Sequence, residues 1–244
     1  MKIWTCGSSA RSGSRNSWTR IKKRQRCQSF EEILGFYRPD SNDFLSWLLA
    51  MDETWLYLYA SETKQQSMEW RQSDSPHSKK FRVQKSARKV IASIFWDQDD
   101  ILIIDYLPKG QTINAEYYSS LLVWCNWRIF WRKNAAGSSP RGSFFLHDKA
   151  PAHRALATQK KLAFLGFQFL DHPPYSPDLS PSDYHLFPGL KKQLKGRHFS
   201  YYAEVIAAAE TRLEGQPSDF FLSGLQKLEQ RAKKWIELRG EYVE

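Results

Sequence analysis

Two β-rich runs separated by a short polar turn constrain the fold most strongly. The runs are Val90–Trp96 and Ile101–Tyr106, and the polar segment Asp97-Gln-Asp-Asp100 joins them. Branched and aromatic residues favour strands, and a short polar turn between two such runs is typical of a hairpin. We therefore expect an antiparallel pair of strands here, which ends at Pro108-Lys-Gly110.

Further strands and helices surround this hairpin. The apolar, aromatic stretch 47–59 predicts a strand, and two shorter strands are expected at 143–147 and 167–170. Helical patterns and capping residues predict helices at 114–130, 151–165, from 182 onward, 203–214 and 218–238. This order predicts a mixed α/β layer architecture. Acids at the ends of the first and fourth strands would be neighbours if those strands pair.

The composition predicts a globular protein with an unusual N-terminal segment. The 244 residues are 41% hydrophobic, with ten Trp and fifteen Phe, and no apolar run is long enough for a membrane span. The net charge is +10, and residues 1–30 contribute most of it because they contain eight Lys or Arg and no acid. We expect residues 1–40 to be a basic, Ser/Arg-rich arm or remnant linker, disordered over residues 1–28 and with a short helix around Phe30–Tyr37, and residues 41–244 to be the folded domain. The arm suits phosphate binding or nuclear targeting, and the alternative is a merely solvated tail.

Three aspartates are the candidate chemical groups. Asp148 ends the apolar run Phe144-Phe-Leu-His-Asp148, and Asp183 follows after an interval of 34 residues in a proline-rich loop. Asp52 lies in the middle of the first predicted strand. Carboxylates brought together from separate segments suit Mg²⁺, and paired Mg²⁺ ions suit phosphodiester chemistry. The alternative is that these aspartates only cap helices and turns.

Three motifs resemble mariner transposases of the mariner/Tc1 group. They are Met51-Asp-Glu-Thr-Trp55, His147-Asp-Lys-Ala-Pro-Ala-His153 and the stretch His172–Phe187, which contains Ser-Pro-Asp-Leu-Ser-Pro-Ser-Asp. The 34-residue interval matches the three-aspartate signature of that family, and the resemblance covers roughly residues 40–244. Cores of this type also occur fused to a SET methyltransferase domain, and we expect no SET-like segment in this chain.

The resemblance implies an RNase H-like fold and DNA transposition. Asp52, Asp148 and Asp183 would be the catalytic and metal-binding residues, with Mg²⁺ as cofactor and Mn²⁺ as a substitute. The implied reaction is cleavage of double-stranded DNA at transposon ends and joining of the 3′-hydroxyl to target DNA. The family works as dimers, so a homodimer is implied, as are a nuclear location and no role for a membrane.

Several residues depart from the family pattern. The family carries two helix-turn-helix units before the core, which we do not expect in the short N-terminal segment here. Lys149 stands where the family usually has Asn, and its charge would oppose bound cations. Tryptophans at 124, 127 and 131 are also unusual. The alternatives are therefore a catalytically impaired remnant that binds DNA or a partner, and a degenerate reading frame that folds poorly.

Two basic stretches and a group of histidines complete the candidate residues. DNA-backbone contacts are expected from Lys79, Lys80, Arg82, Lys85, Lys89, Lys191, Lys192, Lys195 and Arg197, and the alternative is that these side chains are only solvated. The histidines at 147, 153, 172 and 185 lack the spacing of a zinc or iron site. We expect them to position loops or to donate hydrogen bonds to the carboxylates.

Overall fold

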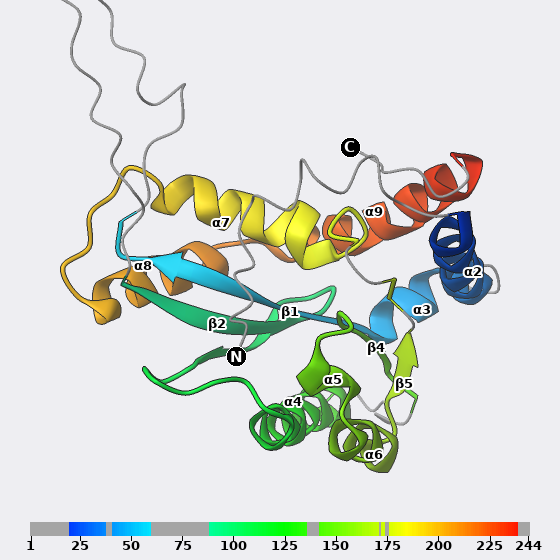
Figure 1. The fold of residues 1–244 in the computed structure, drawn as a ribbon, viewed down its shortest axis with the longest axis horizontal. Coiled ribbons are helices and arrows are strands. Elements are labelled where there is room, and N and C mark those ends of the chain that lie inside the picture. The colour runs from blue at the N-terminus through cyan, green and yellow to red at the C-terminus, as the bar shows by residue number, and fades with distance from the viewer. Residues whose placement is uncertain are drawn as a thin grey trace, which may run out of the picture.

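A five-stranded mixed sheet lies at the centre of the computed structural model, which describes residues 20–37, 41–59, 88–135, 142–170, 172–173 and 176–238. The strands are β1 (Leu48–Tyr57), β2 (Lys89–Trp96), β3 (Ile101–Tyr106), β4 (Phe144–Leu146) and β5 (Gln168–Leu170). Their order in the sheet is β3-β2-β1-β4-β5 (Figure 1). β1 pairs antiparallel with β2 but parallel with β4, and β5 extends the parallel half.

The predicted hairpin is confirmed as β2 and β3. Its turn is stabilised by Asp97, whose Oδ1 accepts hydrogen bonds from the backbone N–H groups of Asp99 and Asp100 at 3.0 and 3.3 Å. This is the local bonding that favours aspartate in turns. The buried Asp97 carboxylate also forms an ion pair with Arg132 of the following helix. The turn is therefore tied to the layer of helices beneath the sheet.

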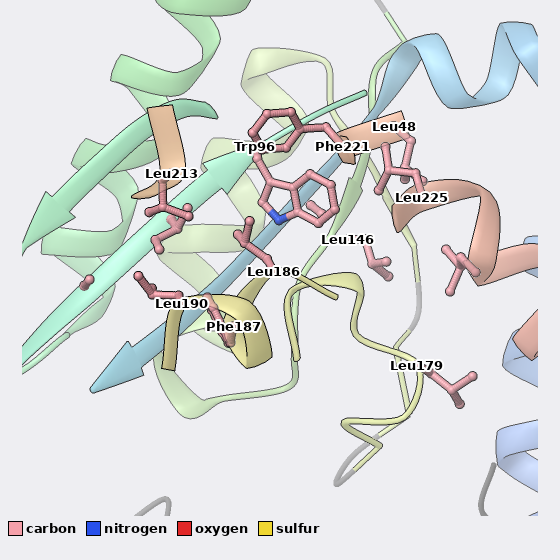
Figure 2. Close-up of a cluster of buried hydrophobic side chains, with 14 of the residues drawn as sticks. Leu48, Trp96, Leu146, Leu179, Leu186, Phe187, Leu190, Leu213, Phe221 and Leu225 are labelled. Carbon is pink, nitrogen blue, oxygen red and sulfur yellow. The ribbon is translucent and has the colours of Figure 1, made fainter. Parts of the chain in front are cut away.

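Helices cover both faces of the sheet (Figure 1). One side carries α2 (Arg20–Tyr37), α3 (Ser41–Trp47), α7 (Phe187–Leu194), α8 (Tyr202–Glu214) and α9 (Ser218–Glu237). The other carries α4 (Ala115–Ala135), α5 (Pro151–Arg154) and α6 (Leu156–Leu165). Each layer buries its own hydrophobic core against the sheet. Figure 2 shows Trp96 of β2 in the first core, among Leu186, Phe187 and Phe221.

The short helix expected around Phe30–Tyr37 is present, but it begins earlier, at Arg20, within the segment expected to be disordered. Residues 20–37 form α2, and its side chains at Phe30, Ile33, Leu34 and Tyr37 are buried. They recur at the spacing of one helix face. This face packs on α9, where the Phe30 and Trp235 rings lie 5.8 Å apart and Tyr37 donates a hydrogen bond to the Leu225 carbonyl at 3.2 Å. The folded unit therefore begins before residue 41, and residues 1–19 lie outside the described part of the chain.

The expected helix from 151 to 165 is divided in two. Ala155 adopts φ −59° and ψ 142°, which separates α5 from α6. Thr158 Oγ1 donates to the Ala152 carbonyl at 2.7 Å across this break, so this carbonyl of α5 keeps a hydrogen-bond partner. Gly166 ends α6 as predicted, with φ 80°, a left-handed conformation that glycine adopts without strain.

Helix α4 presents one buried face and one aromatic face. Tyr118, Leu122 and Cys125 are buried in the second core, whereas Trp124 and Trp131 are about 60% exposed. The indole rings of 124, 127 and 131 meet edge to face along the helix. The three tryptophans that depart from the family pattern therefore form a solvent-exposed stripe on this helix. Among the helices of the described ranges, none is long and apolar enough to cross a membrane.

The docking of α2 can be tested by mutation. Phe30→Ala in the full chain is expected to lower the free energy of unfolding by about 3–5 kcal/mol, because it opens a cavity against Trp235. Phe164→Ala is the matched control, because that side chain is 83% exposed, and it should change stability by less than about 0.5 kcal/mol. Denaturant unfolding measures both variants. Equal stability of the two would show that α2 does not belong to the core.

Candidate active site

The parallel pairing of β1 with β4 brings the first two aspartates together. Leu48 pairs with Phe144, and Ala50 pairs with Leu146. Asp52 lies two residues beyond Ala50, and Asp148 lies two residues beyond Leu146, so the same offset places one acid beside the other. The first and fourth strands were expected to carry neighbouring acids if they paired, and β1 and β4 do pair.

The third aspartate comes from the proline-rich loop. Asp183 lies in η1 (Ser182–Leu186), a π-helical turn that continues directly into α7. Its backbone N–H donates to the Ser180 carbonyl at 2.9 Å. The Ser180 hydroxyl donates to Asp52 Oδ2, also at 2.9 Å. Ser180 therefore connects the first acid to the turn that carries the third.

Two tryptophans hold this loop in place. Trp96 of β2 donates from Nε1 to the buried Ser182 hydroxyl at 2.9 Å. Trp235 of α9 donates to Asp178 Oδ2 at 2.6 Å, and Arg231 donates to the Asp178 carbonyl at 2.9 Å. Ser182 was expected to cap the following helix, but it is the first residue of η1, whose N-cap is Pro181. Its hydroxyl accepts from Trp96 instead, which ties η1 to the sheet.

A close approach between η1 and α9 requires glycine at position 224. Tyr184 donates to the Gly224 carbonyl at 2.9 Å, and His185 bonds to the Phe220 carbonyl at 2.8 Å. A Cβ atom at 224 would lie 2.4 Å from Cδ2 of His185, inside van der Waals contact. The turn that carries Asp183 is thus seated on the last helix.

The electrostatics of the cluster favour a bound cation. Burial raises the pKa of Asp52 well above its ordinary value. The negative charges of Asp183, Glu53 and Asp148 raise it further, in that order, and only the hydrogen bond from Ser180 lowers it. A carboxylate surrounded by other carboxylates is stabilised by a nearby positive charge. A bound divalent cation would offset this repulsion between carboxylates.

The second acid is stabilised by a histidine. Burial alone would raise the pKa of Asp148, but the hydrogen bond and charge of His153 outweigh it and lower that pKa. His153 lies with Nδ1 2.7 Å from Asp148 Oδ1 and Nε2 3.0 Å from Glu53 Oε1. Burial lowers the pKa of His153, but these two carboxylates raise it to about 10. The expectation that a histidine in this region hydrogen-bonds to one of the three aspartates is confirmed.

The residues suit Mg²⁺ better than a metal with a full protein cage. Within the described ranges, no three His, Cys, Asp or Glu side chains are already gathered as a metal cluster. Mg²⁺ usually binds through one or two carboxylates and keeps waters and substrate phosphates as its other ligands. Both hydrogen bonds to the Asp148 carboxylate fall on Oδ1, and the side chain is 49% exposed. Its second oxygen, Oδ2, is therefore the one that can face a cation.

Five of the nine predicted DNA-contact residues lie in the described part of the chain. Lys191 and Lys192 are exposed on α7, and Arg197 is exposed just after it, with Lys195 half-buried between them. Lys89 begins β2, and its ammonium lies 3.6 Å from the centre of the Trp55 ring. The others, Lys79, Lys80, Arg82 and Lys85, lie outside the described residues.

Sequence reasoning did not identify Glu53 and Ser180 as part of this site. Glu53 directly follows Asp52, and Ser180 lies three residues before Asp183, so both were visible in the motifs that contain the acids. Their roles depend on tertiary contacts across 100 and 128 residues of sequence. Only the three-dimensional pairing of these segments identifies them.

Comparison with known proteins agrees with this geometry. Residues 60–130 match a family model described as "Transposase (partial DDE domain)". The chain is 29% identical over 220 residues to the mariner Mos1 transposase of Drosophila mauritiana, covering 90% of this chain and 62% of Mos1. It is also 29% identical over 225 residues to the human histone-lysine N-methyltransferase SETMAR, covering 92% of this chain and 32% of SETMAR.

Solved structures of Mos1 resemble the whole described fold. The paired-end complex with Mn matches with a TM-score of 0.85 at 28% identity, covering 100% of this chain and 68% of that one. The isolated Mos1 catalytic domain matches with a TM-score of 0.77 at 26% identity, covering 94% and 98%. The chain has a mariner transposase catalytic core. The expected RNase H-like mixed sheet flanked by helices is confirmed by the same matches.

The mariner core is expected to respond in opposite ways to neutralisation of its first two acids. In metal-free protein at pH 7, Asp52→Asn should stabilise the fold by about 1 kcal/mol, or 2–4 °C in Tm, because the Asp52 pKa is raised and its ionised form is disfavoured. Asp148→Asn should destabilise the fold, because the Asp148 pKa is lowered and its ionised form is favoured.

Thermal unfolding in EDTA as a function of pH measures both effects. The gain in Asp52→Asn should shrink as the pH falls through about 4, the unfolded-state pKa of an aspartate, and vanish at lower pH, where Asp52 of the wild type is protonated in the folded and unfolded states alike. The loss in Asp148→Asn should disappear as the pH falls through the folded-state pKa of Asp148. Shifts of the same sign in the two variants would contradict this description of the site.

Proposed function

We propose that this chain catalyses DNA cleavage and strand transfer as the core of a mariner-type transposase. The observation that carries the proposal is that Asp148 and Asp183 lie near enough to Asp52 of β1 to raise its pKa. Phosphoryl transfer depends mainly on positioning and on neutralising charge at the attacking and leaving oxygens. A cluster of acids that favours a cation meets that need.

Mg²⁺ is the proposed cofactor, with Mn²⁺ as a substitute. The Mos1 paired-end complex has been solved with Mn and with Mg, which supports this choice. When bound, such ions supply charge neutralisation at the oxygens of the scissile phosphate. Asp52, Asp148 and Asp183 would hold them. Ser180 fixes one oxygen of the Asp52 carboxylate, Oδ2, through its 2.9 Å hydrogen bond.

Double-stranded DNA is the proposed substrate, as transposon ends and as target. Helix α7 continues from the turn that carries Asp183, so the ammonium groups of Lys191 and Lys192 follow the site along one element. Phosphate contacts of this kind position DNA without reading its sequence. The Mos1 strand transfer complex and paired-end complexes support a DNA-joining homodimer. We also propose a nuclear location.

Nicking and joining of DNA test the proposed activity. The purified chain, given supercoiled plasmid and duplex oligonucleotides with free 3′-hydroxyls, should nick and join DNA in Mg²⁺ or Mn²⁺ but not in EDTA. Asp52→Asn, Asp148→Asn and Asp183→Asn should each reduce the rate more than about 100-fold, because each removes a proposed cation ligand.

Asp219→Asn is the matched control, because Asp219 is an exposed acid in the first turn of α9. It should retain wild-type activity. No nicking by the wild type, or equal nicking by Asp148→Asn, would contradict the proposed activity. Salt-sensitive DNA binding without nicking would instead identify a DNA-binding remnant.

Lys149 is expected to weaken cation binding. It directly follows Asp148 and is half-buried, so its ammonium opposes a divalent ion nearby. Lys149→Asn should raise Mn²⁺ affinity by up to about tenfold, the scale left after solvent screening. Lys195→Asn makes the same change in charge beyond α7 and should have no such effect. Electron paramagnetic resonance of free Mn²⁺ measures both, and unchanged affinity in Lys149→Asn would show that its charge points away from the site.

A further inference from the structure

His153 joins two strands that carry proposed cation ligands. Its side chain is only 1% exposed, and both ring nitrogens are within hydrogen-bond distance of carboxylates. Nδ1 lies 2.7 Å from Asp148 Oδ1, and Nε2 lies 3.0 Å from Glu53 Oε1. Ionised carboxylates only accept hydrogen bonds, so both nitrogens donate. One imidazole ring therefore bridges the end of β4 and the middle of β1.

The ring has little freedom to rotate away from these partners. The Tyr118 ring lies 4.1 Å from it, centre to centre, and the His147 ring lies 4.8 Å away in a stacked arrangement. Tyr118 is itself held by a 2.6 Å hydrogen bond between its hydroxyl and His147 Nδ1. The His153 backbone N–H donates to the Ala150 carbonyl at 3.0 Å. Packing and hydrogen bonds thus fix the ring that contacts Asp148.

The bridge fixes the Asp148 carboxylate in one orientation. His153 and the Ala150 backbone N–H both bond to Oδ1, at 2.7 and 2.9 Å. Two donors on Oδ1 leave the other oxygen, Oδ2, available to a cation. Glu53 follows Asp52 in the chain, so the far end of the bridge is anchored beside the first acid. The distance between the first two acids is therefore set partly by this bridge.

We propose that Glu53 and His153 are positioning residues that hold Asp148 ready for a divalent cation, with Glu53 acting through His153. The inference rests on the proposed function, because it requires Asp148 to bind a cation. Partners of metal-binding carboxylates commonly change metal affinity when they are removed. Here the partner is itself oriented by a second carboxylate on the strand of the first acid.

Mn²⁺ affinity tests the proposal without relying on catalysis. The site to follow is the fraction of Mn²⁺ binding to the full chain that Asp148→Ala abolishes, measured by electron paramagnetic resonance. His153→Ala and Glu53→Ala are each expected to weaken this site about 10- to 100-fold. Glu53→Gln should stay near the wild type, because its side-chain oxygen can still accept from Nε2.

A double-mutant cycle separates positioning from general destabilisation. If Glu53 acts through His153, adding Glu53→Ala to His153→Ala should cause no further loss of Mn²⁺ affinity. Thr158→Val is the control, because it removes the 2.7 Å hydrogen bond to Ala152 of α5 without touching Asp148. It should lower thermal stability and leave Mn²⁺ affinity unchanged.

The outcomes distinguish this inference from the proposed function. Wild-type Mn²⁺ affinity in Glu53→Ala, or additive losses in the double variant, would overturn the inference alone. Wild-type protein without any Asp148-dependent Mn²⁺ binding would contradict the proposed function and the inference with it. If His153→Ala does not fold, the contrast between Glu53→Ala and Glu53→Gln tests the bridge by itself.

Discussion

The parallel pairing of β1 with β4 is the contact on which the rest of the site depends. Successive residues of a strand face opposite sides of the sheet, so a slip of one residue would turn Asp52 to the wrong face. Burial on both faces prevents that slip. Leu48 and Ala50 lie in the core between the sheet and α7–α9, whereas Leu49 and Met51 lie in the core between the sheet and helices α4 and α6. Hydrophobic burial of β1 on both faces therefore determines the face on which the Asp52 carboxylate lies.

The third acid is positioned by a different kind of interaction. Asp183 does not belong to a strand, so strand pairing does not position it. Instead, the loop before it is held by indole N–H groups, one from Trp96 in the sheet and one from Trp235 in the last helix. Each is a hydrogen bond between largely buried groups, whose loss leaves a partner unsatisfied. The last helix, which buries Trp235 against α2, thus contributes to the site from the far end of the chain.

Local sequence signals predicted the elements, and tertiary contacts decided the exceptions. The hairpin, the strand with Asp52 and the glycine stop at Gly166 follow from periodicity and turn chemistry, and the structure agrees. A helix around Phe30–Tyr37 was also predicted, but the basic residues before it suggested disorder and hid its start at Arg20. The break at Ala155 and the Glu53–His153 bridge depend on contacts that no local pattern encodes.

The central claim is that three carboxylates from β1, the end of β4 and η1 form one cation site. Crystals of the full chain grown with Mn²⁺, measured at the manganese absorption edge, test this most directly through anomalous scattering. The claim predicts an anomalous peak within coordination distance, about 2.0–2.6 Å, of Asp148 Oδ2 and of Asp52 or Asp183. Manganese bound elsewhere, with the three carboxylates left apart, would contradict it.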